Sequence, residues 1–73
     1  MKLSSLVGGT ATVIGPEATL AEAAEALITD GVGSLAVVEG RRLVGIITER
    51  DVVRAVADGA DAEEESVADW MSD

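Results

Sequence analysis

The sequence lacks cysteine, histidine, phenylalanine and tyrosine, and it has one proline and one tryptophan in 73 residues. Without cysteine there is no disulfide framework and no thiol nucleophile, and without histidine there is no Ser-His triad. The usual nitrogen and sulfur ligands of zinc are absent as well. No apolar run approaches the ~20 residues that span a bilayer, and the N-terminus has no signal-peptide pattern. We therefore expect one small cytoplasmic domain with no membrane segment.

Charge is the next constraint. The chain carries 14 acidic and 5 basic residues, for a net charge of −9. Because nucleic acids are bound by lysine and arginine side chains that neutralise phosphates, this balance argues against a nucleic-acid polymer as partner. A small nucleotide is not excluded, since exposed charges more than ~8 Å apart are largely screened at physiological salt. We expect the clustered basic residues to offset the acidity locally; they are Arg41, Arg42, Arg50 and Arg54.

Two helices are predicted from their start signals and apolar spacing. The first begins at Thr19, where Thr19-Leu20-Ala21-Glu22 matches a capping box, and it ends at Gly31. Its apolar face is formed by residues three and four apart, namely Leu20, Ala23, Ala24, Leu27 and Ile28. The second begins near Thr48 and ends before Gly59, with apolar residues Val52, Val53 and Val56.

Three strands are predicted around these helices. The first is Ala11–Ile14, which Gly15-Pro16 ends. The other two, Leu35–Val38 and Leu43–Ile47, form a hairpin with a polar turn between them. The order is strand, helix, strand, strand, helix, and a right-handed crossover places the second strand parallel to the first. The predicted fold class is α/β (α+β), with a small three-stranded sheet.

The hairpin strands carry apolar side chains throughout. Strands with one wet face usually alternate apolar and polar residues, whereas continuous apolar strands are usually buried on both faces. Two short helices can cover only one face of the sheet. We therefore expect the other face to pack on a second copy of the chain or on another domain.

The stretch Gly45-Ile46-Ile47-Thr48-Glu49-Arg50-Asp51 is the main candidate for a functional site. It ends a strand and begins a helix, with the Thr48 hydroxyl and the Asp51 carboxylate three residues apart. A helix start carries unpaired N–H groups and a partial positive charge, which suit a phosphate, and a carboxylate accepts hydrogen bonds from ribose hydroxyls. The same residues also match a capping box, which needs no ligand.

Residues 61–73 are predicted to be an acidic linker. Such a charge run is usually a solvated linker or a helix start. A metal site is the alternative interpretation of its carboxylates, which belong to Asp61, Glu63, Glu64 and Glu65. The amphipathic stretch Val67–Met71 follows, and we expect Trp70 and Met71 to pack on the domain or on a partner.

Taken in order, three segments resemble a CBS domain, the cystathionine-β-synthase motif that occurs in regulatory pairs called Bateman modules. The segments are Thr12–Leu20, Gly31–Val38 and Gly45–Asp51. The resemblance covers nearly the whole chain, 1–73, as a single motif with its core at about 10–58, and residues 67–72 resemble the lead-in to a second motif. It implies that two three-stranded sheets pack face to face around a pseudo-two-fold axis, with clefts for adenosine-containing ligands.

The resemblance also implies a ligand site. Asp51 would hold the ribose hydroxyls, Thr48 and the helix start would contact phosphate, and Arg50 is a second candidate phosphate contact. The adenine slot would be formed by the backbone and side chains of Val13, Ile14, Leu35 and Ala36. The family often has proline where this chain has Ala36, so the strand beside the adenine pocket is less rigid here.

The predicted function is that of a regulatory module, not an enzyme, that binds AMP, ADP, ATP, S-adenosylmethionine or NADH, with no catalytic residue, catalytic cofactor or metal. It would form a homodimer through the sheet face or pair with a second CBS motif, and it would act on an attached enzyme or transporter. The alternative is a ligand-free association module, which the same apolar sheet supports. An enzyme is the third option, but neither Glu49 nor Asp51 has an evident buried setting for acid–base work.

Overall fold

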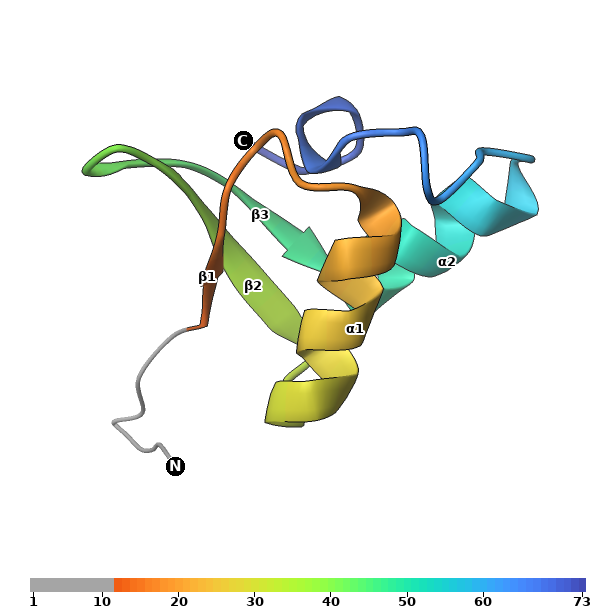
Figure 1. Cartoon of the computed structure of the whole chain (residues 1–73), viewed down its shortest axis with the longest axis horizontal. Helices are drawn as coiled ribbons and strands as arrows, with labels where there is room; N and C mark the ends of the chain where they lie inside the picture. Colours follow the sequence, from red (N-terminus) through yellow and green to blue (C-terminus); the bar gives the residue numbers. More distant parts are fainter. Residues whose placement is uncertain (1–11) are drawn as a thin grey trace.

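The computed structural model describes residues 12–73, which contain a three-stranded sheet and two helices (Figure 1). The predicted order of elements is confirmed, and a short 3-10 helix, η1, follows them. The elements are β1 (Val13–Ile14), α1 (Leu20–Asp30), β2 (Ser34–Glu39), β3 (Arg42–Thr48), α2 (Glu49–Ala57) and η1 (Val67–Asp69).

The sheet has the order β1-β2-β3, with β1 parallel to β2 and β2 antiparallel to β3. Helix α1 makes the crossover between the two parallel strands, as the sequence predicts. Strand β1 has two residues, fewer than expected, although Thr12 still accepts a hydrogen bond from the Ala36 N–H at 3.0 Å. Ala11, the predicted first residue of this strand, lies outside the described residues.

The capping box that begins α1 is confirmed. The Thr19 N–H donates to Glu22 Oε1 at 2.9 Å, and the Glu22 N–H donates to Thr19 Oγ1 at 3.1 Å. Gly31 ends the helix in the left-handed region, at φ 64°, which glycine adopts without a steric cost. The predicted apolar face is partly wrong, because Ile28 is 82% exposed whereas Leu20 and Leu27 are buried.

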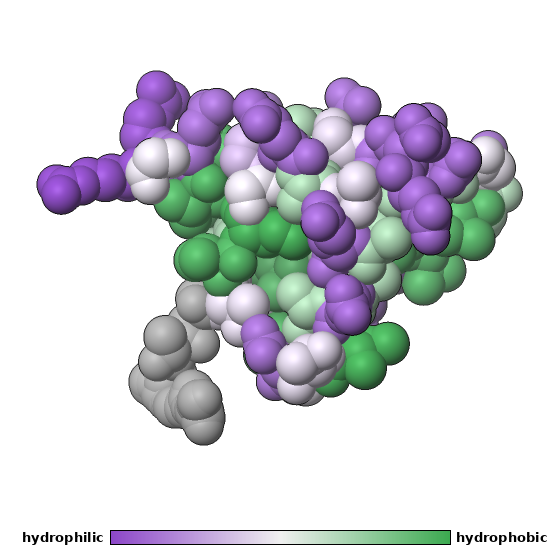
Figure 2. Space-filling model, in the orientation of Figure 1, coloured by the Kyte–Doolittle hydropathy of each residue, from purple (hydrophilic) through white to green (hydrophobic). Residues whose placement is uncertain are grey.

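Both helices pack on the same face of the sheet, where they bury alternate residues of the hairpin. The buried core consists of Leu20, Ala23, Leu27, Leu35, Val37, Ile47, Ala55 and Val67. No helix among residues 12–73 covers the other face, which we call the bare face. Val13 is 60%, Leu43 63% and Ile46 45% exposed, and Figure 2 shows hydrophobic residues at the surface beside the sheet. The prediction that the two helices cover one face only is confirmed.

The acidic C-terminal part packs against the domain, in contrast to the solvated linker that the charge run predicts. The carbonyl of Glu65 accepts a hydrogen bond from the Leu20 N–H at 3.0 Å, and that of Ala62 accepts one from the Ala21 N–H at 2.9 Å. These bonds satisfy amides of the first turn of α1, which have no partner inside the helix. Val67 is fully buried in the core. This segment therefore stabilises the start of α1.

Gly45 lets the end of the chain reach the sheet. Ser72 forms an antiparallel bridge with Ile46 on the outer edge of β3, with N···O distances of 2.8 and 2.9 Å. A Cβ atom on Gly45 would lie 2.7 Å from both Met71 Sδ and the Ser72 carbonyl oxygen. The glycine is therefore needed for this close approach. Trp70 and Met71 pack against the core, as predicted.

Candidate ligand-binding site

Thr48 and Asp51 form a capping box at the start of α2. The Thr48 N–H donates to Asp51 Oδ2 at 2.9 Å, and the Asp51 N–H donates to Thr48 Oγ1 at 3.1 Å. Both side chains are half-buried. The interpretation of these residues as a capping box is thus confirmed. A ligand can bind only to the donors and acceptors that the capping box does not use.

The capping box leaves one donor and one acceptor. The Thr48 hydroxyl accepts from the Asp51 amide, and its own hydrogen remains to be donated. Asp51 uses Oδ2 in the box, and Oδ1 remains to accept hydrogen bonds. A phosphate oxygen matches the free hydroxyl donor, and a ribose hydroxyl matches the free carboxylate acceptor. Capping and ligand binding are therefore chemically compatible.

The start of α2 offers fewer backbone donors than the sequence suggests. The Glu49 N–H donates to the Gly33 carbonyl at 3.0 Å, and the Asp51 N–H is taken by Thr48. Of the first three amides of the helix, the Arg50 N–H is the one for which residues 12–73 provide no acceptor. One amide and the helix dipole remain to attract an anion.

Strand pairing brings two of the predicted adenine contacts to the same face as Thr48. Val13 pairs with Ala36, which pairs in turn with Ile46, so the three side chains form one row on the bare face. Ser34 pairs with Thr48, two residues further along the same two strands. The bare face therefore presents an apolar row next to the polar end formed by Thr48 and Asp51.

Ile14 and Leu35 point to the other face. Leu35 is 1% exposed in the core, and Ile14 is half-buried against that core. Their neighbours Val13 and Ala36 face outward, because successive side chains of a strand alternate. The side chain of Leu35 therefore supports the strand from beneath, and of the expected backbone and side-chain contacts only those of its backbone remain available to the adenine slot.

Two residues of this face were not predicted as site residues. Ile46 completes the apolar row and is 45% exposed, and Ser34 is exposed beside Thr48. The strand alternation could have identified Ile46, which lies two residues before Thr48 and so shares its face. Ser34 could be identified only from the register of β2 on β3.

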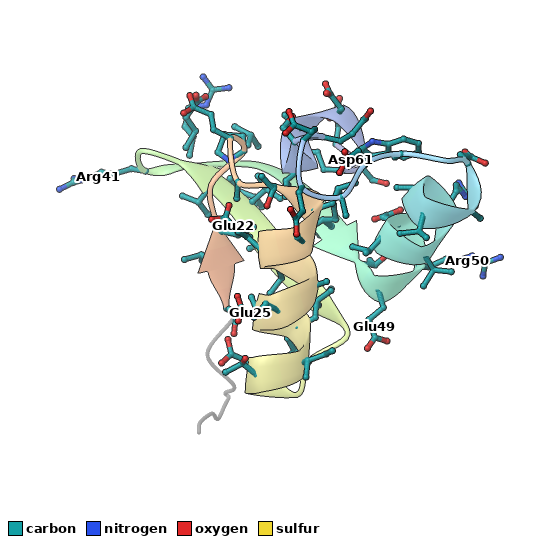
Figure 3. The ribbon with its side chains drawn as sticks, turned by 45° about the vertical axis from the view of Figure 1, so that its right-hand side comes forward. Glu22, Glu25, Arg41, Glu49, Arg50 and Asp61 are labelled. Carbon is teal, nitrogen blue, oxygen red and sulfur yellow. The ribbon has the colours of Figure 1, made fainter. Side chains whose placement is uncertain are left out.

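The two arginines of the hairpin, Arg41 and Arg42, do not lie at the start of α2. Arg50 is exposed and projects outward from α2, whereas Arg41 lies at the hairpin tip, across the molecule (Figure 3). Arg41 precedes β3, and Thr48 is the last of its seven residues. At about 3.3 Å per residue, the strand places these two residues about 20 Å apart. Within a single chain, Arg41 and Arg42 therefore cannot offset the acidic charge near Thr48, and that expectation is wrong.

The structure gives no support to a metal site in the acidic segment. Among the described residues, 12–73, no group of three or more acidic side chains is placed to hold a metal ion. The Asp61 carboxylate instead accepts a hydrogen bond from the Glu63 N–H at 3.0 Å, which orders the turn. Within the same range, no helix has the length and apolarity required to cross a bilayer.

Comparison with known proteins gives a consistent result. The family model described as "CBS domain" matches residues 10–58. A curated 17.7 kDa protein of Acidianus ambivalens is 42% identical over 57 residues, which are 77% of this chain and 35% of that protein. This chain therefore spans about a third of the length of that relative.

Solved structures share the fold. A CBS-domain-containing protein from Agrobacterium tumefaciens is 35% identical, with a TM-score of 0.81 over 86% of this chain and 52% of the other. A CBS domain protein from Pyrobaculum aerophilum, solved as a complex with AMP, is 26% identical, with a TM-score of 0.78 over 85% of this chain and 49% of the other. This chain thus spans about half the length of these structures.

Proposed function

Because this chain belongs to the CBS domain family, we propose that it is a regulatory module that binds an adenosine-containing ligand on its bare sheet face. The single observation that carries the proposal is the pair of groups left free by the capping box, the Thr48 hydroxyl and Asp51 Oδ1, at the end of an apolar row. The AMP complex of the Pyrobaculum aerophilum relative supports the ligand class.

The ligand would lie along the face with its parts matched to these residues. Asp51 holds the ribose hydroxyls, Thr48 and the free Arg50 amide contact the phosphate, and the adenine lies on Val13 and Ala36. The core side chains Ile14 and Leu35 fix the position of that strand pair from beneath. AMP, ADP, ATP, S-adenosylmethionine and NADH all contain the adenosine part that this arrangement selects.

The ligand site requires a second sheet to complete it. An open face would leave the adenine in water, whereas ligand sites usually bury most of their ligand. We therefore assign the bare face to a homodimer or to a second CBS motif. A ligand held between the two sheets shifts the equilibrium between two relative arrangements of the sheets by as much as its affinities for them differ. An attached enzyme or transporter would respond to that shift.

The competing function is association without a ligand, which the exposed apolar residues Val13, Leu43 and Ile46 favour. Thermal unfolding separates the two. A ligand present at 100 times its dissociation constant adds about 2.7 kcal/mol to the free energy of unfolding. We expect one of the five nucleotides to raise the melting temperature and none to be turned over. If none of the five raises it, association is the function.

A further inference from the structure

The two ends of β3 carry opposite charge. At the hairpin tip, Arg41 and Arg42 are exposed beside Glu39, which leaves one net positive charge. At the other end, the start of α2 carries Glu49, Arg50 and Asp51, which leaves one net negative charge. Figure 3 shows Arg41 and Glu49 on opposite sides of the molecule.

The two-fold axis of a sheet-to-sheet dimer lies in the plane between the two sheets. If the axis runs along the strands, the hairpin tips of both copies meet, and Arg41 of one copy faces Arg41 of the other. If the axis runs across them, each tip lies over the start of α2 in the other copy. Like charges in apposition are destabilising and opposite charges favour association, so the second arrangement is preferred.

The apolar residues fit the same arrangement. An axis that passes between Val44 and Gly45 exchanges Arg41 with Thr48, because these two positions are equally far from it in the sequence. The same axis places Leu43 of one copy over Ile46 of the other. These side chains are 63% and 45% exposed in the single chain, and each would cover the other.

We propose that two copies of this chain pair sheet to sheet with their β3 strands antiparallel, so that Arg41 of each copy contributes a phosphate contact at the Thr48–Asp51 end of the other. The ligand contact rests on the proposed function, whereas the pairing stands without it. The site receives in this way an arginine that lies about 20 Å away within its own chain. A guanidinium suits a phosphate because it presents several N–H donors in one plane.

The pairing is tested by cross-linking, because the chain has no native cysteine. Arg41→Cys and Glu49→Cys chains, mixed and oxidised, should form a disulfide between the two different variants. Arg41→Cys alone should remain uncross-linked. A disulfide between two Arg41→Cys chains, or no disulfide in a mixture whose mass is that of a dimer, overturns the proposed pairing.

The ligand contact is tested with AMP and adenosine. Arg41→Gln should weaken AMP binding roughly tenfold or more and leave adenosine binding unchanged, because only AMP carries the phosphate. Arg54→Gln, which removes the same charge from an exposed position on α2, should change neither affinity. Equal AMP affinity of Arg41→Gln and the native chain overturns the contact. If the native chain binds neither compound, the proposed function fails while the cross-link still decides the pairing.

Discussion

At the scale of single residues, Thr48 caps α2, and its proposed contact with a phosphate can be separated from that role. Thr48→Ala removes the side-chain acceptor of the capping box and should lower the free energy of unfolding by about 1 kcal/mol without any ligand. Thr48→Ser retains the oxygen and should stay close to the native stability. Urea unfolding of both variants checks this; equal loss in the two would mean that the methyl group, and not the capping oxygen, stabilises this position.

Asp51 tests the ligand role more directly. Asp51→Asn keeps the shape of the side chain but replaces one carboxylate oxygen with a donor, so it should weaken recognition of the ribose hydroxyls. We expect a loss of nucleotide affinity of roughly tenfold or more, measured by calorimetry. The Asp30→Asn variant, altered at an exposed position at the end of α1, is the control and should bind normally. Unchanged affinity of Asp51→Asn would remove Asp51 from the site.

Gly45 is required by its neighbours. Gly45→Ala places a Cβ atom 2.7 Å from the Ser72 carbonyl oxygen, which is backbone and cannot rotate away. We expect a loss of roughly 1–3 kcal/mol, as for other overpacked positions. Gly33→Ala is the matched control, since its Cβ would meet only Glu49 Oε1 at 3.9 Å. Thermal unfolding of the two variants should therefore differ, and similar melting temperatures would show that the C-terminal segment does not hold its place against β3.

At the scale of elements, the segment that ends in η1 is part of the domain. Its carbonyls cap α1, and Val67 is buried in the core. Val67→Ala should lower the free energy of unfolding by roughly 1–3 kcal/mol through lost burial and a residual cavity. Val53→Ala, at a position 66% exposed on α2, should change it by less than about 0.5 kcal/mol. If the two valine variants unfold alike in urea, the segment contributes little to stability.

At the scale of the whole molecule, the proposed dimer is tested by substitutions on the bare sheet face. Leu43→Asp puts a charge in the centre of the proposed interface and should convert the dimer to a monomer in sedimentation. Ile28→Asp introduces the same charge at a site 82% exposed on α1 and should leave the mass unchanged. A dimer that survives Leu43→Asp and dissociates with Ile28→Asp would place the interface on the helices instead.

Local sequence signals determined the secondary structure. Thr19 and Thr48 each have an acidic residue three positions later, and both form the predicted capping box. Gly31 ends α1 as predicted, because only a residue tolerant of positive φ closes a helix in this way. These signals are reliable because the groups that interact are three or four residues apart, so no distant part of the chain is needed to complete them.

Tertiary packing decided which of the predicted residues share a face. Apolar character alone does not distinguish Leu35, which is buried, from Leu43, which is exposed; the distinction depends on where α1 and α2 lie. The same holds for Arg41, which is close to Thr48 in sequence but is separated from it by the length of β3. The close fit of Ser72 on Gly45 joins residues 27 positions apart, which no local pattern encodes. Sequence thus determined the elements and the capping residues. The composition of the proposed ligand face arose from the register of the strands, because register is set only when the strands pair.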